Sequence, residues 1–297
     1  MCDKECGWVG LMIKKVVIPA AGLGTRLLPI TKELPKEMLP IFLRGKGGGI
    51  CLKPMLQAVF EQLYDFGFRE YGFIVGRGKR AIEDHFTADE SFLEYLKDSN
   101  KVKLAGELRD FYEKIGNSTI VFINQPKPRG FGDAVYRAKL FTGNEPFLIH
   151  AGDDLILTQN NDHLRRVMKV FENYDADAAF LVEEVKDPRG YGVIVGDEIN
   201  SGIFKVRKVV EKPQQPPSNL AIIALYTFKP IIYQAIKKVK PDESGEVQLT
   251  DAVSFLLDWQ CRIYALKLKI GERRMDIGTP ETYLETLRIT AQDLQKP

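Results

Sequence analysis

Cysteine and histidine are scarce in this chain of 297 residues, which has four cysteines and three histidines. The cysteines have none of the spacings of a structural metal site, and the pair Cys2 and Cys6 alone is weak evidence of one. Neither a Ser-His-Asp nor a Cys-His arrangement is evident, so no covalent nucleophile is predicted. We expect the histidines to be structural, and so few cysteines favour a reducing, cytoplasmic location. The three histidines are His85, His150 and His163.

Long apolar runs and a large excess of one charge are also missing. No run approaches the roughly 20 residues of a membrane-spanning helix, and the net charge of +2 gives no field for nucleic acid or a membrane surface. The first eleven residues lack the apolar core of a secretion signal, so we interpret residues 1–13 as an N-terminal extension. No composition break indicates a linker in residues 14–297, which we predict to form a single domain.

The most informative stretch runs from Lys14 to Pro40, KKVVIPAAGLGTRLLPITKELPKEMLP. Its β-branched run at 16–18 predicts a strand buried on both faces, and Pro19 ends the strand because proline has no N–H to donate. Small residues and glycines follow, whose amides can turn inward and form an anion-binding nest. Arg26 and Lys36 then add two positive charges. A strand, a glycine loop and two cations together predict a polyphosphate site.

Two well-known phosphate-binding motifs do not explain this stretch. The ATPase-type loop, Gly-x-x-x-x-Gly-Lys-Ser/Thr, occurs nowhere in the chain. The dinucleotide fingerprint needs a small residue at its third glycine position, where Leu27 stands. Residues 76–81, GRGKRA, match a loose form of that fingerprint after the second predicted strand. We interpret them as an ordinary strand-to-helix turn, with a dinucleotide site as the alternative.

Apolar runs alternate with helical patterns through the first half of the chain. Such alternation predicts right-handed βαβ crossovers, hence an α/β fold with a Rossmann-like, mainly parallel sheet flanked by helices. Ligands of such sheets bind beyond the carboxyl ends of the strands, where both the glycine loop and Asp153 fall. Strands are predicted at 16–18, 71–75, 119–123 and 146–150, and helices at 54–63, 81–86, 92–96, 104–115 and 132–140.

The second half has strands joined by short turns, which predict added antiparallel pairing, and a final amphipathic helix at 281–294. Residues 44–49, RGKGGG, are too rich in glycine for regular structure, so we expect an inserted mobile loop there. The strands predicted in this half are 178–182, 192–195, 204–210 and 221–228.

The words IPAAGLGTRLLPITKELPKEMLP resemble the nucleotide-binding signature of the sugar-phosphate nucleotidyltransferases, and further matches continue to Thr279. TKELPKEMLP and GEVQLTDAV (residues 245–253) look most like the bacterial-type uridylyltransferase branch. The resemblance implies a Mg²⁺-dependent reaction in which glucose 1-phosphate attacks the α-phosphorus of UTP, giving UDP-glucose and pyrophosphate. It also implies a nucleotide-binding part at about 14–155 and a sugar-phosphate-binding part at about 156–297.

Matching positions carry the family's roles over to this chain. Asp153 and Asp276 match the two metal ligands; Asp154 is a less favoured neighbour that would point elsewhere or cap the next element. Mg²⁺ suits such carboxylates and usually takes only one or two of them from the protein. Arg26 and Lys36 match the catalytic cations that hold the triphosphate. The loop residues expected to bind the nucleotide are Ala20, Ala21, Gly22, Leu23, Gly24 and Thr25.

Base and sugar recognition are expected in two further segments. Gln125 matches a residue that pairs with the base through its amide donor and acceptor, and Gly130 and Gly132 would let the backbone lie against base and ribose. The family often has histidine where Asp133 stands, so this chain departs from the pattern there. In the second half Lys212 matches the catalytic lysine on the sugar phosphate. The other sugar-phosphate-binding candidates are Gly192, Glu211 and Asn219.

Alternatives remain at this point. A thymidylyltransferase with the same fold would use dTTP, and one methyl group is worth only about 1–3 kcal/mol in a pocket. A catalytically silent, nucleotide-binding regulatory subunit would be expected to lose charged residues that this chain keeps. A dinucleotide-dependent oxidoreductase built on residues 76–81 is a poorer alternative. The family resemblance also implies a homo-oligomer, dimer or tetramer, and we expect no nucleic-acid or membrane partner.

Overall fold

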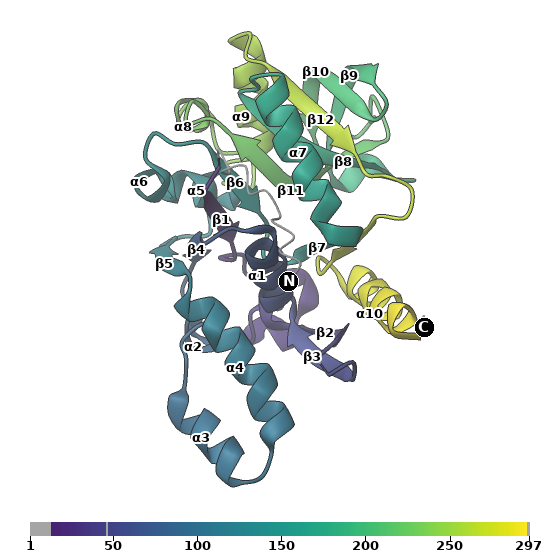
Figure 1. Cartoon of the computed structure of the whole chain (residues 1–297). Helices are drawn as coiled ribbons and strands as arrows, with labels where there is room; N and C mark the ends of the chain where they lie inside the picture. The colour runs from purple at the N-terminus through teal and green to yellow at the C-terminus, as the bar shows by residue number, and fades with distance from the viewer. Residues whose placement is uncertain (1–12, 46, 296–297) are drawn as a thin grey trace, which may run out of the picture.

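The computed structural model describes residues 13–45 and 47–295 (Figure 1). The expected N-terminal extension lies outside these residues except for Ile13, which is buried in the core. A nine-stranded sheet runs through both halves of the chain in the order β5-β4-β1-β6-β11-β8-β12-β10-β9. One sheet therefore includes strands from both halves of the chain.

The first half of the sheet is parallel. β1 (Lys15–Pro19) lies between β4 (Glu70–Val75) and β6 (Phe147–His150), and β5 (Thr119–Asn124) forms the edge beside β4. The residues of the apolar run at 16–18 are completely buried, alternately in the cores above and below the sheet. The strand expected to be buried on both faces is therefore confirmed.

Antiparallel strands extend the sheet in the second half. β11 (Leu220–Phe228) pairs antiparallel with β6 and with β8 (Ala178–Glu184). β12 (Ile263–Lys267) is parallel to β8, and β10 (Ile203–Glu211) and β9 (Gly192–Asn200) complete the far edge as an antiparallel pair. The α/β fold with antiparallel strands added in the second half is confirmed, and the whole sheet is mixed.

Helices cover both faces of the sheet and make a three-layer structure. One core cluster includes α1 (Met55–Phe66) and α7 (Asp162–Asn173), and the other includes α5 (Gly130–Arg137), α8 (Ile232–Ile236) and α9 (Leu249–Asp258). The apolar stripe of each helix packs on alternate residues of the strands, as expected for this class of fold.

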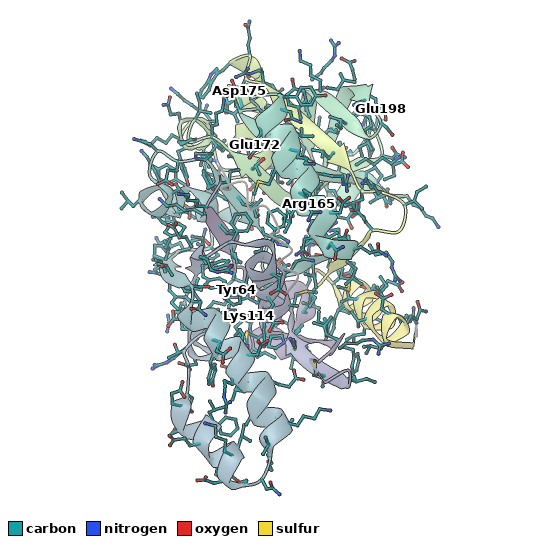
Figure 2. All side chains as sticks on the ribbon, in the orientation of Figure 1. Tyr64, Lys114, Arg165, Glu172, Asp175 and Glu198 are labelled. Atoms are coloured by element: carbon teal, nitrogen blue, oxygen red, sulfur yellow. The ribbon has the colours of Figure 1, made fainter. Side chains whose placement is uncertain are left out.

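An arm of two helices, α3 (Glu90–Asp98) and α4 (Val102–Gly116), extends away from the sheet at the bottom of Figure 1. At its base Lys114 on α4 lies beside Tyr64 on α1 (Figure 2), with its Nζ 5.7 Å from the ring centroid. Lys114 also pairs with Asp65 at 3.1 Å. These contacts join the arm to the body. Two shorter helices are α2 (Arg80–His85) and α6 (Lys139–Thr142).

The loop predicted at 44–49 connects the two strands of a β-hairpin that was not predicted. β2 (Pro40–Arg44) pairs with β3 (Ile50–Pro54), and Gly45 N–H donates to the Gly49 carbonyl at 2.8 Å across the turn. The hairpin was not predicted from the sequence, because the glycine run indicates only a loop and the residues that pair lie on either side of it. The C-terminal helix α10 (Pro280–Gln295) packs against β2, and the predicted helix at 281–294 is confirmed.

Several elements have no counterpart among the predicted segments. One is a two-stranded sheet formed by β7 (Asp154–Leu157) and β13 (Arg273–Asp276). More than a hundred residues separate these two strands in the sequence. Helices α7, α8 and α9 and strand β12 also lacked a prediction. Within the described residues no helix is long and apolar enough to cross a membrane.

Candidate functional site

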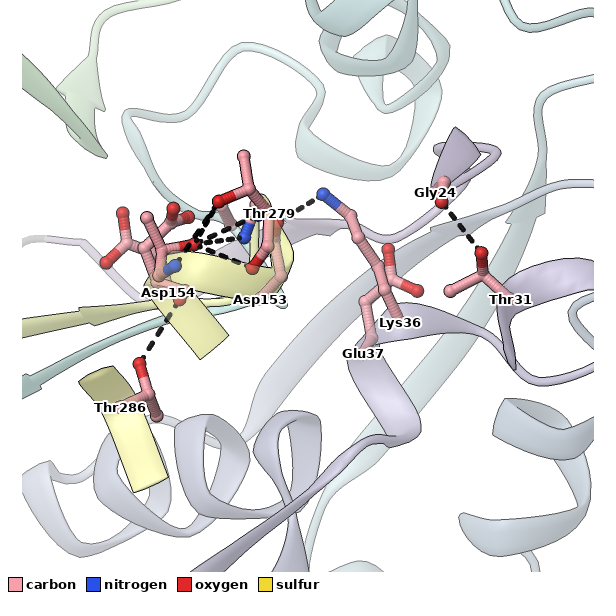
Figure 3. A network of polar contacts seen from close by, with 12 residues as sticks. Gly24, Thr31, Lys36, Glu37, Asp153, Asp154, Thr279 and Thr286 are labelled. Atoms are coloured by element: carbon pink, nitrogen blue, oxygen red, sulfur yellow. Dashed lines mark hydrogen bonds and ion pairs between the residues drawn. The ribbon is translucent and has the colours of Figure 1, made fainter. Parts of the chain in front are cut away.

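The glycine loop follows β1 and is fixed by a short hydrogen bond. Gly24 has a φ of 66°, a left-handed conformation that favours glycine. The hydroxyl of Thr31 donates to the Gly24 carbonyl at 2.7 Å (Figure 3), and a Cβ on Gly24 would lie 3.1 Å from Thr31 Cβ. A side chain at this position would therefore be both strained and crowded, so the loop keeps its backbone open to a ligand.

A cavity of about 470 Å³ opens beside this loop at the carboxyl ends of β1, β5 and β6. This is the edge of a parallel sheet at which ligands are expected. Ala20 is not part of the wall, because it is buried and donates its N–H to the Ile74 carbonyl at 2.8 Å. The predicted residues that line the cavity are Ala21, Gly22, Leu23, Gly24, Thr25, Arg26, Lys36, Gln125, Gly130, Asp153 and Asp276.

Two carboxylates meet on the opposite wall of this cavity. Asp153 follows β6, and Asp276 ends β13, whose pairing with β7 sets Asp276 opposite Asp154. The amide of Ile277 donates to the Asp153 carbonyl at 3.0 Å and locks the two segments together. Strand pairing over a long sequence separation thus brings the two predicted metal ligands to one place. Hard carboxylate oxygens of this kind are what Mg²⁺ prefers.

Asp154, the neighbour of Asp153, has a different environment. It begins β7, is buried, and its Oδ2 accepts a hydrogen bond from Arg274 Nε at 2.7 Å. Burial raises the pKa of Asp154 to about 7, although Arg274 pulls it down. Asp153 lines the cavity and Asp154 does not, which supports the preference for Asp153 as the ligand.

Arg274, for which we had no prediction, connects the acidic groups beneath the site. Besides Asp154 it contacts Glu183 at 2.8 Å and Asp276 at 3.8 Å, and its guanidinium lies 5.6 Å from the ring centroid of Tyr191. Burial disfavours the charge of Arg274, but the surrounding carboxylates outweigh it and raise its pKa. Burial likewise raises the pKa of Asp276, against the effect of Arg274. One cation therefore balances the buried Asp154 and the half-buried Glu183 and Asp276.

Lys36 reaches across the cavity to Asp153 (Figure 3), and the two form an ion pair. Burial alone would lower the pKa of Lys36, but Asp153, Glu37 and Asp276 raise it well above its ordinary value. The side chain therefore remains an ammonium. Beneath it Lys79 pairs with the buried Glu37 at 2.9 Å. Burial raises the pKa of Glu37, and Lys79 opposes this effect.

The pair of Lys79 and Glu37 explains residues 76–81. Lys79 is buried, and it links the turn after β4 to the segment that carries Lys36. Residues 76–81 therefore form a strand-to-helix turn between β4 and α2, as the main interpretation predicted. Lys79, through its contact with Glu37, supports the wall of the cavity.

Arg26 differs from Lys36 because it is exposed at the rim. It lies in the short 3₁₀ turn Thr25–Leu27, lines the cavity, and forms no ion pair within residues 13–45 and 47–295. An exposed guanidinium without a carboxylate partner can turn to an incoming anion at little cost. The geometry is that of a cation available for a phosphate.

Gln125 and α5 form the other end of the cavity. Gln125 follows β5, and its Nε2 donates to the Gly130 carbonyl at 3.2 Å and to Asp133 Oδ2 at 2.8 Å. Both amide hydrogens are thus used within the protein. We predicted that this amide would offer both a donor and an acceptor to the base. In the structure only its acceptor, Oε1, remains available.

Gly130 and Gly132 have a structural reason to be glycine. A Cβ on Gly130, whose φ is 88°, would lie 2.9 Å from backbone atoms of Val247, and one on Gly132 would lie 2.8 Å from the Val247 carbonyl. Gly132 N–H donates to that carbonyl at 2.9 Å, and Val247 N–H donates to the Arg129 carbonyl at 2.8 Å. The close neighbour is therefore a segment of the second half, and Gly132 does not line the cavity.

None of the four sugar-phosphate candidates lines the cavity, and three of them, Gly192, Glu211 and Lys212, are close to Tyr191. A Cβ on Gly192 would lie 3.0 Å from Glu211 Oε2, and Lys212 N–H donates to the Tyr191 carbonyl at 3.0 Å. Tyr191 itself lines the cavity. Lys212 has a φ of 40°, a conformation that is rare outside glycine and that clusters at functional sites. Asn219 is exposed just before β11.

Comparison with known proteins decides the family. The model of the nucleotidyl transferase family matches residues 15–293. The chain belongs to this family. A UTP–glucose-1-phosphate uridylyltransferase of Pseudomonas aeruginosa is 35% identical over 289 residues, 96% of this chain and 98% of the relative. One of Streptococcus pyogenes is 39% identical over 282 residues, 92% of this chain and 87% of the relative.

Solved structures of nucleotidyltransferases have the same fold. A UDP-glucose pyrophosphorylase complexed with UDP-glucose superposes with a TM-score of 0.80 at 32% identity, over 95% of this chain and 99% of that chain. The UTP-bound enzyme of Acinetobacter baumannii gives a TM-score of 0.81 at 27% identity, over 96% and 95%. The resemblance inferred from the glycine loop is thereby confirmed.

The carboxylates of this nucleotidyltransferase supply part of the ligand set of a divalent cation. Asp153 and Asp276 supply two hard oxygen donors at the cavity, and within the described residues no third His, Cys, Asp or Glu joins them. Two carboxylates suit Mg²⁺, because it usually keeps several waters and takes its other ligands from substrate phosphates. The donor set therefore fits magnesium held jointly by protein and substrate.

Sequence reasoning missed about half of the cavity wall. Arg274, Glu37 and Tyr191 could have been suspected only from their neighbourhood to Asp276, Lys36 and Gly192. Phe131 and Ala134 belong to a segment that had been singled out for base recognition. The cavity-lining residues without a prediction are Pro19, Glu37, Pro128, Phe131, Ala134, Tyr191, Glu246, Arg274 and Gly278.

Proposed function

We propose that this chain transfers the uridylyl group of UTP to glucose 1-phosphate in a Mg²⁺-dependent reaction. The observation that carries the proposal is one cavity that combines a glycine loop, two cations and two carboxylates, Asp153 and Asp276. The names of its relatives support the substrates. The UDP-glucose held by a solved relative supports the product.

The proposed step is direct displacement. A phosphate oxygen of glucose 1-phosphate forms a bond to the α-phosphorus of UTP while the bond from that phosphorus to the bridging oxygen of the β-phosphate breaks. The electron pair of the broken bond leaves with pyrophosphate. Both reactants are anions, so the enzyme's task is to bring them together and to spread the developing charge. No covalent enzyme intermediate is needed.

Each part of the site has a role in this proposal. The amides at Ala21–Thr25 cradle the triphosphate, and Arg26 and Lys36 neutralise the departing pyrophosphate. Asp153 and Asp276 would hold Mg²⁺, which supplies charge neutralisation at the phosphates when it is bound. Lys212 binds the sugar phosphate, with Glu211 on the sugar hydroxyls. Gly192 and Asn219 are proposed to shape that subsite.

The two halves of the domain divide the substrates in this proposal. Residues 14–155 supply the nucleotide site, and residues 156–297 supply most of the sugar-phosphate site. We also propose a cytoplasmic enzyme that acts as a dimer or tetramer. The family resemblance supports the assembly, and the described cysteines, Cys51 and Cys261, which are both free, support a reducing compartment.

The test is pyrophosphate release in the presence of Mg²⁺. UTP, dTTP, CTP, ATP and GTP are each combined with glucose 1-phosphate and with other hexose 1-phosphates. We expect UTP with glucose 1-phosphate to give the highest kcat/KM. Faster turnover with dTTP would replace the proposal with a thymidylyltransferase, and no release by folded protein with any pair would replace it with a binding-only subunit.

A further inference from the structure

The buried group next to Gln125 is a carboxylate that fixes which end of the amide faces the cavity. Gln125 and Asp133 are both more than nine-tenths buried, and Gln125 Nε2 lies 2.8 Å from Asp133 Oδ2. Arg137, one helical turn further along α5, donates to Asp133 Oδ1 at 2.8 Å and to Oδ2 at 3.4 Å. Arginine, aspartate and glutamine therefore form a chain that ends at the cavity.

The chemistry of this chain of contacts sets its direction. A guanidinium can only donate, so it selects the ionised carboxylate, which can only accept. The group that Gln125 turns towards Asp133 must then be its Nε2. The Gly130 carbonyl, a second acceptor, takes the other amide hydrogen at 3.2 Å. Two acceptors on one side make the reverse orientation of the amide unfavourable.

The remaining group of Gln125 is its Oε1. Gln125 lines the cavity, and its Oε1 accepts no hydrogen bond from the described residues. The side chain thus presents a bare acceptor at the end of the cavity that also contains Phe131 and Ala134. Burial in a medium of low dielectric strengthens the two contacts that hold it.

We propose that Asp133, backed by Arg137, is a positioning residue that makes Gln125 an obligate acceptor and thereby selects a base with an N3–H. This inference rests on the proposed function, in which Gln125 faces the base of the triphosphate. Uracil carries a hydrogen on N3, whereas cytosine has a lone pair there. An amide oxygen opposite N3 attracts the first base and repels the second. Thymine also carries N3–H, so the device separates UTP from CTP but not from dTTP.

The experiment compares UTP with CTP in four proteins: wild type, Gln125→Ala, Asp133→Ala and the double variant. For each protein kcat/KM is measured with both triphosphates, and Kd is measured by calorimetry with UDP and CDP. We expect Asp133→Ala to reduce the preference for uracil by about tenfold, as for one neutral hydrogen bond. In the Gln125→Ala background the same change should reduce it no further, because Asp133 acts through Gln125.

A matched control is Asp162→Ala. Asp162 and Arg166 form an aspartate–arginine pair with the same order and spacing on α7, at 3.2 Å, away from the cavity. This variant should keep the wild-type preference for uracil. A merely structural role of Asp133 would lower kcat/KM for UTP and CTP equally, and this result would overturn the inference.

Failure of the inference and failure of the proposed function give different results. Additive losses of preference in the double variant, or equal affinity of the wild type for UDP and CDP, would overturn the role of Asp133 even with normal turnover. Loss of UDP preference in Asp133→Ala by a protein that releases no pyrophosphate would support the role of Asp133. That second result would overturn only the proposed reaction.

Discussion

The two walls of the cavity are built in opposite ways. The loop wall, residues 21–26, consists mainly of backbone and one exposed cation, Arg26, without a carboxylate partner in the described chain. The carboxylate wall, which comprises Asp153, Arg274 and Asp276 with the buried Asp154 behind them, consists of half-buried and buried charges that are already paired. Asp153 pairs with Lys36, and Asp154 and Asp276 pair with Arg274. One wall offers free donors to a ligand, and the other has already matched its charges.

This difference suggests that the loop wall mainly determines ligand affinity, whereas the carboxylate wall holds the site in its active arrangement. The loop wall has little internal energy to lose, so changes there should affect ligand affinity more than folding. In the carboxylate wall, several acids lie close together, and their mutual repulsion and desolvation destabilise the fold. The positive charges of Arg274 and Lys36 offset this destabilisation. Changes there should affect both stability and turnover. Four substitutions test this contrast.

The largest effect is expected for Arg274→Met. Removing the guanidinium leaves the buried Asp154 and the half-buried Glu183 and Asp276 without their counter-charge, and we expect a loss of about 3–5 kcal/mol in the free energy of unfolding. Urea denaturation at neutral pH measures it. Arg207→Met is the control, because Arg207 pairs with Asp197 at the exposed surface and should cost under about 1 kcal/mol. Similar losses for the two variants would remove the contrast between buried and exposed pairs.

Asp153→Ala should lower turnover by at least about 100-fold, or roughly 2.7 kcal/mol in the activation barrier, because the proposed metal ligand is lost. The measurement is pyrophosphate release from UTP and glucose 1-phosphate over a range of Mg²⁺ concentrations. Asp197→Ala, on the surface of β9, is the control and should keep normal turnover. Near-normal activity of a folded Asp153→Ala protein would mean that the metal is held elsewhere.

Acid should destabilise the fold through two buried histidines. Burial lowers the pKa of His163 on α7 to about 3 and that of His150 at the end of β6 to about 4. A histidine whose folded pKa is lowered binds its proton in the unfolded chain first, so stability is lost as pH falls below 6.5.

His163→Leu tests this loss directly. Both ring nitrogens of His163 lack a hydrogen-bond partner in the described chain, so leucine can replace the ring without breaking a hydrogen bond. The stability of the variant relative to wild type should rise by roughly 2 kcal/mol between about pH 6.5 and about pH 4.5. Denaturation curves at both pH values measure it. A constant difference would show that His163 does not contribute to acid sensitivity.

The smallest effect is expected on the loop wall. Arg26→Gln should raise KM for the triphosphate by about tenfold, since one charge-assisted contact is lost, with no measurable change in thermal stability. Lys32→Gln is the control, because Lys32 lies on the next 3₁₀ turn, is exposed, and does not line the cavity. A clear fall in Tm for Arg26→Gln would show that the loop wall also depends on internal pairing.

The local parts of the site were predictable from sequence. Val16–Ile18 reads as a buried strand, and the glycines after it favour a phosphate loop, because both signals depend only on adjacent residues. The same holds for Asp153, which follows a short apolar run. These features are confirmed as elements of the fold, and their catalytic roles stay proposals.

The remaining parts depend on contacts between distant segments. Arg274 lies 120 residues from Asp154 and 91 from Glu183 in the sequence, so no local sequence pattern predicts that the three interact. Gly132 was interpreted as room for a ligand, but the space is filled by Val247, which only the tertiary fold brings there. Gln125 was assigned correctly to the cavity, whereas the orientation of its amide is set by Asp133 and Gly130.

The position of β11 has a consequence for synthesis of the chain. β6 is complete at His150, but the strand that covers its outer edge, β11, begins only at Leu220. A nascent chain that has emerged only as far as β6 therefore has a buried-type strand with an open hydrogen-bonding edge, which can pair with other chains. The sheet closes only when β11 has been translated, so a ribosome stalled between these strands would expose an aggregation-prone intermediate.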